Sequence, residues 1–163
     1  MFFKKALFIP LLTILLAPST CIKKNVCDGS IDLKVDQTTL NKDIEILDSY
    51  LSDNNISAQV DSTGIRYIIN KEGSGKRATP CSKITITYLG KKLDGKVIDL
   101  QKDPETYPLN DLIVGWQIGL SKIKEGGAIT LYVPSGYAYG KKGTDGIPPY
   151  TNLIFQINLL EVQ

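Results

Sequence analysis

The sequence predicts an α+β fold in which an antiparallel β-sheet wraps around one short helix, with a separate helical extension at the N-terminal side. Two observations lead to this class. Segments with strand-like alternation lie on both sides of a single short stretch with helical spacing, and a longer helical stretch precedes all of them. The chain has 163 residues, which is enough for one ordinary domain and an appendage.

Residues 1–20 have the pattern of a secretory signal peptide. Two lysines precede an apolar run from Ala6 to Ala17 that only Pro10 and Thr13 interrupt. This run is too short to cross a bilayer core, which needs roughly 20 residues. A buried N-terminal helix is the alternative, and Pro10 argues against it because proline breaks helix interiors. We therefore expect the protein to be exported to the cell envelope.

The three cysteines fit this expectation. Cys21 lies where a bacterial lipoprotein signal places its lipidated cysteine, and ordinary cleavage nearby is the alternative to a lipid anchor in the membrane. An acylated Cys21 leaves Cys27 and Cys81, for which an oxidising compartment favours a disulfide over two separate thiols. Three cysteines without any histidine argue against zinc, and we expect no metal site.

Residues 21–62 are expected to form a polar tether followed by an amphipathic helix. The tether runs to about Asp36, and Thr38 or Thr39 is the expected helix cap, with the helix ending near Asn54-Asn55. An apolar stripe recurs at helical spacing through Leu40, Ile44, Leu47 and Leu51. Its packing partner is either the main domain or a second copy of the chain.

Residues 63–163 are expected to form the main domain. The expected strands are Gly64 to Asn70, Ile84 to Leu89, Ala128 to Val133 and Leu153 to Leu160. Gly90 and Asp94-Gly95 are expected turns. Apolar residues at helical spacing predict a helix from Leu109 to Ile123, ended by a glycine cap within Lys124 to Gly127.

The absence of histidine limits the chemistry of this chain. No unperturbed side chain titrates near neutrality, a serine nucleophile would lack its usual base, and no carboxylate pair suggests glycosidase chemistry. A net charge of +2 with scattered lysines argues against nucleic acid as a partner. Trp116, the only tryptophan, instead lies near a tyrosine-rich loop at 137–140 and a Gly/Pro-rich loop at 146–149. These segments indicate a small aromatic-walled pocket that needs no cofactor.

Six segments, in order and at compatible spacing, carry a resemblance to a known family. They are Thr87-Tyr-Leu-Gly90, Asp94-Gly95 with Ile98-Asp99, Leu112-Ile-Val-Gly-Trp116, Val133-Pro-Ser-Gly-Tyr-Ala-Tyr-Gly140, Gly146-Ile-Pro-Pro149 and Leu153-Ile-Phe155. Through them, residues 63–163 resemble FKBP-type peptidyl-prolyl cis/trans isomerases. The resemblance implies proline-containing polypeptides as substrates and assistance to the folding of exported proteins.

The resemblance also implies a role for each pocket residue. Trp116 would form the floor under the proline ring; Tyr88, Phe155 and Ile98 the walls; Leu112 and Ile113 the rim; and Ile147 the far side. The Ile113 N–H and the Tyr139 hydroxyl would contact the substrate, and Asp99 would bond to the polar edge. Two positions depart from the family pattern, because Ile98 stands where Phe is usual and Glu105 falls where an apolar wall residue is common.

Two other functions remain open from the sequence. The domain could be a catalytically weak FKBP-fold module that binds proline-containing peptides or a partner protein. It could also be a purely structural surface lipoprotein, in which case Trp116, Tyr139 and Phe155 would match the family by coincidence.

Overall fold

The computed structural model describes residues 27–163, so the predicted signal peptide and Cys21 lie outside the described residues. The helices are α1 (Gln37–Asp53) and α2 (Val114–Leu120), with 3₁₀ turns at Leu109–Asp111 and Ser135–Tyr137. The strands are β1 (Gln59–Val60), β2 (Arg66–Lys71), β3 (Lys83–Lys92), β4 (Val97–Pro108), β5 (Gly127–Val133) and β6 (Leu153–Val162). None of the helices in this range has the length and apolarity needed to cross a membrane.

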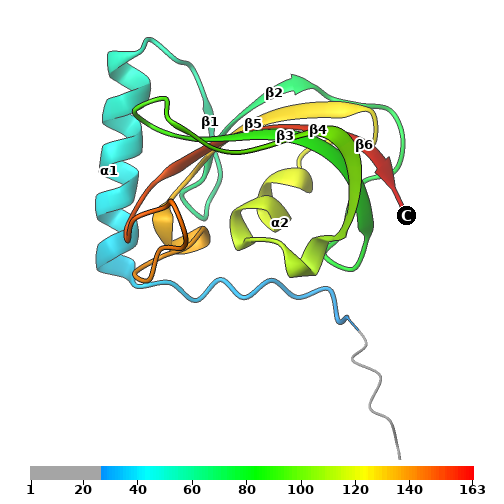
Figure 1. The fold of residues 1–163 in the computed structure, drawn as a ribbon, viewed down its shortest axis with the longest axis horizontal. Coiled ribbons are helices and arrows are strands. Elements are labelled where there is room, and N and C mark those ends of the chain that lie inside the picture. The colour runs from blue at the N-terminus through cyan, green and yellow to red at the C-terminus, as the bar shows by residue number, and fades with distance from the viewer. Residues whose placement is uncertain (1–26) are drawn as a thin grey trace, which may run out of the picture.

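The strands form one antiparallel sheet in the order β1-β2-β5-β6-β3-β4, and it curves over α2 (Figure 1). This confirms the predicted fold class, including the helix that precedes the domain. Four strands lie close to their expected positions, whereas β1 and the long β4 were not predicted. Most of β4 is exposed and polar because it lies at the sheet edge, so it carries no apolar alternation for a pattern to detect.

Two expected turns have different outcomes. Gly95, with φ of 85°, lies in the turn between β3 and β4 as expected. Gly90 instead lies inside β3, where it pairs with Asp99 on one side and with Phe155 on the other. The expectation of a turn at Gly90 is therefore wrong.

Helix α2 packs closely against the concave face of the sheet. Gly115 and Gly119 face β5, and a Cβ atom on either would come within 2.4 Å of the side chain of Val133 or Leu131. The helix ends at Leu120, earlier than the apolar spacing predicts. The predicted glycine cap is also wrong, because Gly126, with φ of 80°, belongs to the turn that leads into β5.

Helix α1 stands beside the sheet, and its apolar stripe packs on the main domain (Figure 1). Leu47 and Leu51 are buried against Tyr132 and Ile154, which point to the outer face of β5 and β6. The helix is capped by Asp36, whose carboxylate accepts a hydrogen bond from the Thr39 N–H at 2.8 Å, and not by a threonine. The partner of the stripe is thus the main domain of the same chain.

The segment before α1 was expected to be a tether, but much of it is fixed to the domain. The structure joins Cys27 to Cys81 by a disulfide, with 5.5 Å between their Cα atoms. From there the chain runs below α2 to the foot of α1 (Figure 1), and Ile31 and Val35 pack against the core. The expectation of a free tether is therefore wrong for this part of the segment, and its residues 21–26 lie outside the described range.

Candidate active site

A small pocket opens between α2, β3, β4, β6 and the loop that follows β5. It encloses about 90 Å³ and is lined by Tyr88, Asp99, Tyr107, Leu112, Ile113, Trp116, Tyr139 and Phe155. The structure thus brings together all of the predicted pocket residues except Ile98 and Ile147. Pockets for drug-sized ligands have volumes of roughly 300–1,000 Å³. This pocket suits a single small ring.

Three aromatic rings from three different elements form the inner part of the pocket. The ring of Trp116, on α2, lies 4.8 Å from that of Tyr88 on β3 and 5.1 Å from that of Phe155 on β6. Both pairs meet nearly edge to face, at 77° and 86°, which is a favoured arrangement of aromatic quadrupoles. The rings therefore support one another and present a rigid apolar surface.

Gly90 explains how Phe155 fits into this arrangement. The two residues are direct neighbours across β3 and β6, and a Cβ atom on Gly90 would lie 2.8 Å from the Phe155 ring. Any larger residue at this position would push the ring out of place. The sequence pattern could not show this, because a glycine in a strand and a glycine in a turn look the same.

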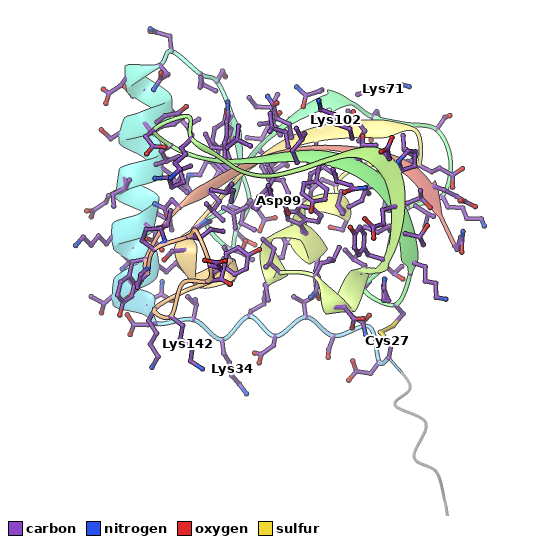
Figure 2. The ribbon with its side chains drawn as sticks, in the orientation of Figure 1. Cys27, Lys34, Lys71, Asp99, Lys102 and Lys142 are labelled. Atoms are coloured by element: carbon purple, nitrogen blue, oxygen red, sulfur yellow. A yellow bond between two sulfur atoms is a disulfide. The ribbon has the colours of Figure 1, made fainter. Side chains whose placement is uncertain are left out.

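The polar edge of the pocket is built around Asp99, which Figure 2 shows between the sheet and α2. The Tyr88 hydroxyl donates a hydrogen bond to Asp99 Oδ2 at 2.6 Å, and the Leu100 N–H donates to Oδ1 at 2.8 Å. Burial and the adjacent Asp99 carboxylate raise the pKa of Tyr88. Burial and the same carboxylate also raise the pKa of Tyr139.

Two N–H groups in the lining residues have no acceptor in the described part of the chain. No atom of residues 27–163 accepts a hydrogen bond from the backbone N–H of Ile113, which precedes the first turn of α2. Within the same range, the indole N–H of Trp116 is buried and also unpaired. The Ile113 N–H, beside an apolar pocket, is suited to a carbonyl oxygen of a bound peptide, whereas the indole N–H is fully buried.

Ile98 and Ile147 do not line the pocket. Ile98 lies on β4 beside Gly90 and Phe155 and packs against the core behind the aromatic wall. Ile147 is 7% exposed and is part of the core itself, in a turn that its backbone closes with Thr144. Neither residue forms part of the pocket surface.

Tyr107, near the end of β4, is the lining residue that the sequence did not reveal. A bulge places three residues of β4, 102–104, opposite the single residue Thr87 of β3, since Ile86 pairs with Glu105 but Tyr88 pairs with Gln101. The neighbouring Glu105 carboxylate, together with partial burial, raises the pKa of Tyr107 to about 12. The wall that Glu105 seemed to lack is thus supplied by Tyr107. Glu105 and Tyr107 are two residues apart, and residues at this spacing in a strand point to the same face, which was the one signal for Tyr107 in the sequence.

The arrangement offers apolar walls and hydrogen-bond donors, but no nucleophile with an adjacent base. Within residues 27–163 no group of three histidine, cysteine or acidic side chains is placed to hold a metal ion.

Comparison with known proteins gives a consistent result. The family model for the FKBP-type peptidyl-prolyl cis-trans isomerase matches residues 75–160, which is more than half of the chain. The FKBP-type peptidyl-prolyl cis-trans isomerase FkpA of Escherichia coli is 38% identical over 105 residues, which cover 63% of this chain and 39% of that protein. The peptidyl-prolyl cis-trans isomerase Mip of Coxiella burnetii is 36% identical over 106 residues, which cover 63% and 46%.

The crystal structure of FkpA from Escherichia coli has a TM-score of 0.67 and 32% sequence identity to this chain. The match covers 78% of this chain and 64% of that structure. The chain spans less than half of the length of each of these two curated relatives.

Proposed function

This chain belongs to the FKBP-type peptidyl-prolyl cis-trans isomerase family, and we propose that its pocket catalyses rotation about Xaa-Pro bonds in other polypeptides. The observation that carries this proposal is the aromatic pocket around Trp116, which fits one small ring and has free donors in its lining. The polypeptides would be exported proteins during folding. A protease-free assay of an Xaa-Pro peptide, with and without the protein, tests this activity.

The physical reason for catalysis lies in the amide bond itself. Rotation about it faces a barrier of about 18–20 kcal/mol because resonance keeps the bond planar, while cis and trans differ little in energy for proline. Apolar walls disfavour the polar, planar form of the imide. The Ile113 N–H and the Tyr139 hydroxyl are donors that can favour the carbonyl of the twisted form. No proton has to move, so a site without histidine is sufficient.

The polar edge is expected to matter less than the aromatic walls. Asp99→Ala should lower kcat/KM less than truncation of Phe155, because it removes the hydrogen bond from Tyr88 but leaves the rings in place. Tyr139→Phe should have a smaller effect still, since it removes one hydroxyl and keeps the ring. Steady-state kinetics of the three variants test this order, and an Asp99→Ala loss larger than that of Phe155→Ala would contradict it.

The rate is expected to be independent of pH between about 6 and 8, because no histidine is present to titrate there. The raised pKa values of Tyr88, Tyr107 and Tyr139 have the same consequence. A raised pKa keeps the hydroxyl protonated to higher pH, so these donors persist throughout this interval. A bell-shaped profile of kcat/KM in this interval would reveal an acid–base pair absent from this account.

We further propose that the protein is exported and lipid-anchored at Cys21, after removal of residues 1–20. The disulfide between Cys27 and Cys81 supports export, because such bonds persist in oxidising compartments. Mass spectrometry of protein isolated from the cell envelope would find an acylated Cys21 at the N-terminus. An unmodified Cys21 would contradict the anchor, and retention of residues 1–20 would contradict the signal peptide.

The alternative is a binding module that recognises proline-containing peptides or a partner with little turnover. A pocket that binds the planar form of the imide as well as the twisted form would hold a peptide without accelerating rotation. The two functions differ in one result. A binding module would change the fluorescence of Trp116 on peptide addition without accelerating isomerisation.

A further inference from the structure

A buried hydrogen-bond network connects α1 to the turn Ser135–Tyr137. The Asp43 side chain, on α1, accepts a hydrogen bond from the Ser135 hydroxyl at 2.6 Å. Asn152 joins the same network, because its amide donates to the Asp43 carbonyl at 3.2 Å and accepts from the Ser135 N–H at 2.9 Å. All three residues are almost completely buried, with exposed fractions of 3%, 0% and 5% for Asp43, Ser135 and Asn152. Ser135 is therefore held from two sides.

Ser135 in turn determines where Tyr139 lies. Its carbonyl accepts hydrogen bonds from the N–H groups of Ala138, at 3.0 Å, and Gly140, at 2.8 Å, which are the two neighbours of Tyr139. The backbone on both sides of the tyrosine is thus fixed to one oxygen atom. A displacement of Ser135 would move Tyr139, which lines the pocket.

The cost of burying Asp43 suggests that it does more than stabilise α1. No cation pairs with it among the described residues, and burial raises its pKa despite the hydrogen bonds from Ser135 and Gly136. A buried carboxylate without a cation is costly, and an apolar side chain would hold a helix in place more cheaply. Helix α1 already has another polar anchor, since Asp48 binds the buried Arg66 through two hydrogen bonds of 2.8 Å.

We propose that Asp43 is a positioning residue for the isomerase reaction, which fixes the Tyr139 side chain at the pocket through Ser135. The inference rests on the proposed function, and it means that α1 contributes to the reaction although it lies outside the pocket. Asp43 does not contact the substrate; it acts through the turn Ser135–Tyr137 and the loop that follows.

Kinetics of anchor variants test the proposal. Asp43→Ala should lower kcat/KM about fivefold, a size typical of coupled neighbours, and mainly through kcat, because Tyr139 acts on the twisted form. Ser135→Ala removes the donor of the same hydrogen bond and should lower kcat/KM by a similar factor. It replaces Asp43→Ala in the test if that variant does not fold. Asp43→Asn keeps an acceptor for the Ser135 hydroxyl and should retain most of the activity. The matched control is Asp48→Ala, which releases the other anchor of α1 and should leave kcat/KM within about twofold.

A double-mutant cycle separates positioning from general destabilisation. With Tyr139→Ala already present, Asp43→Ala should change kcat/KM by less than about twofold, because its target is gone. If Asp43→Ala lowers kcat/KM by the same factor in the wild-type and the Tyr139→Ala protein, the proposal is overturned. It is also overturned if Asp48→Ala lowers kcat/KM as much as Asp43→Ala does.

The Tyr139 ring signals in NMR spectra, assigned with Tyr139→Phe, give a readout that does not depend on turnover. They should shift in Asp43→Ala and Ser135→Ala but not in Asp48→Ala, and unshifted signals would overturn the positioning role. An inactive wild-type protein with the expected NMR shifts would reject the isomerase function, and with it any effect of Asp43 on the reaction, but not the positioning of the Tyr139 loop by Asp43.

Discussion

Phe155→Ala is expected to lower isomerase efficiency by an order of magnitude or more, which corresponds to at least about 1.4 kcal/mol of transition-state stabilisation. Phe155 is 3% exposed, forms one wall of the pocket, and supports Trp116 by an edge-to-face contact. Its truncation would open the pocket to water and remove one of the two aromatic rings that meet the Trp116 ring edge to face. Both changes weaken the apolar environment that the mechanism requires.

Loss of stability has to be separated from loss of chemistry in this variant. Truncation of a buried phenylalanine costs about 3–5 kcal/mol of folding free energy. Ile157→Ala is a matched control, because Ile157 is 2% exposed, lies two residues further along β6, and does not line the pocket. If circular dichroism shows both variants folded, only Phe155→Ala should lose activity. A folded Phe155→Ala protein with full turnover would remove Phe155 from the site.

The second large effect concerns stability. Replacing Cys27 and Cys81 by serine should lower the free energy of unfolding by roughly 4 kcal/mol, from the loop-closure entropy of a bridge that spans 54 residues. The disulfide also holds the packed segment that carries Ile31 and Val35 to the foot of α1. Urea unfolding of the oxidised protein and of the double variant measures this difference.

The same experiment has a clear contrary outcome. Equal unfolding midpoints and slopes for the two proteins would show that the disulfide adds nothing to stability. Free, alkylatable Cys27 and Cys81 in unreduced protein from the cell envelope would show that the bond does not form there. Activity should change little in the double variant at low temperature, because neither cysteine lines the pocket.

The elements that could be predicted from the sequence are those whose burial requires an apolar pattern. Strand β3 and the middle of β6 alternate between more and less buried residues, β5 is buried almost throughout, and the stripe of α1 faces the sheet. Strand β4 has no such pattern, since it lies at the sheet edge. The Asp36 cap was missed because two threonines followed at equally suitable positions.

The candidate site shows the same limit. Residues within the quoted motifs, such as Trp116 and Phe155, could be placed at the pocket from the resemblance alone. Tyr107 could not, because the bulge in β4 decides which residue faces inward, and this bulge depends on pairing with β3. The contact between Asp43 and Ser135 joins residues 92 positions apart, and no local pattern indicates it.

The central claim is that this pocket accelerates proline isomerisation, and its most direct test is the rate of cis-to-trans conversion of an Xaa-Pro peptide. Uncatalysed conversion takes about 10–100 s at 25 °C, which leaves a wide range in which to see acceleration. The catalysed rate should rise in proportion to the concentration of wild-type protein and fall at least about tenfold with Phe155→Ala. A folded wild-type protein that leaves the peptide at its uncatalysed rate would contradict the claim.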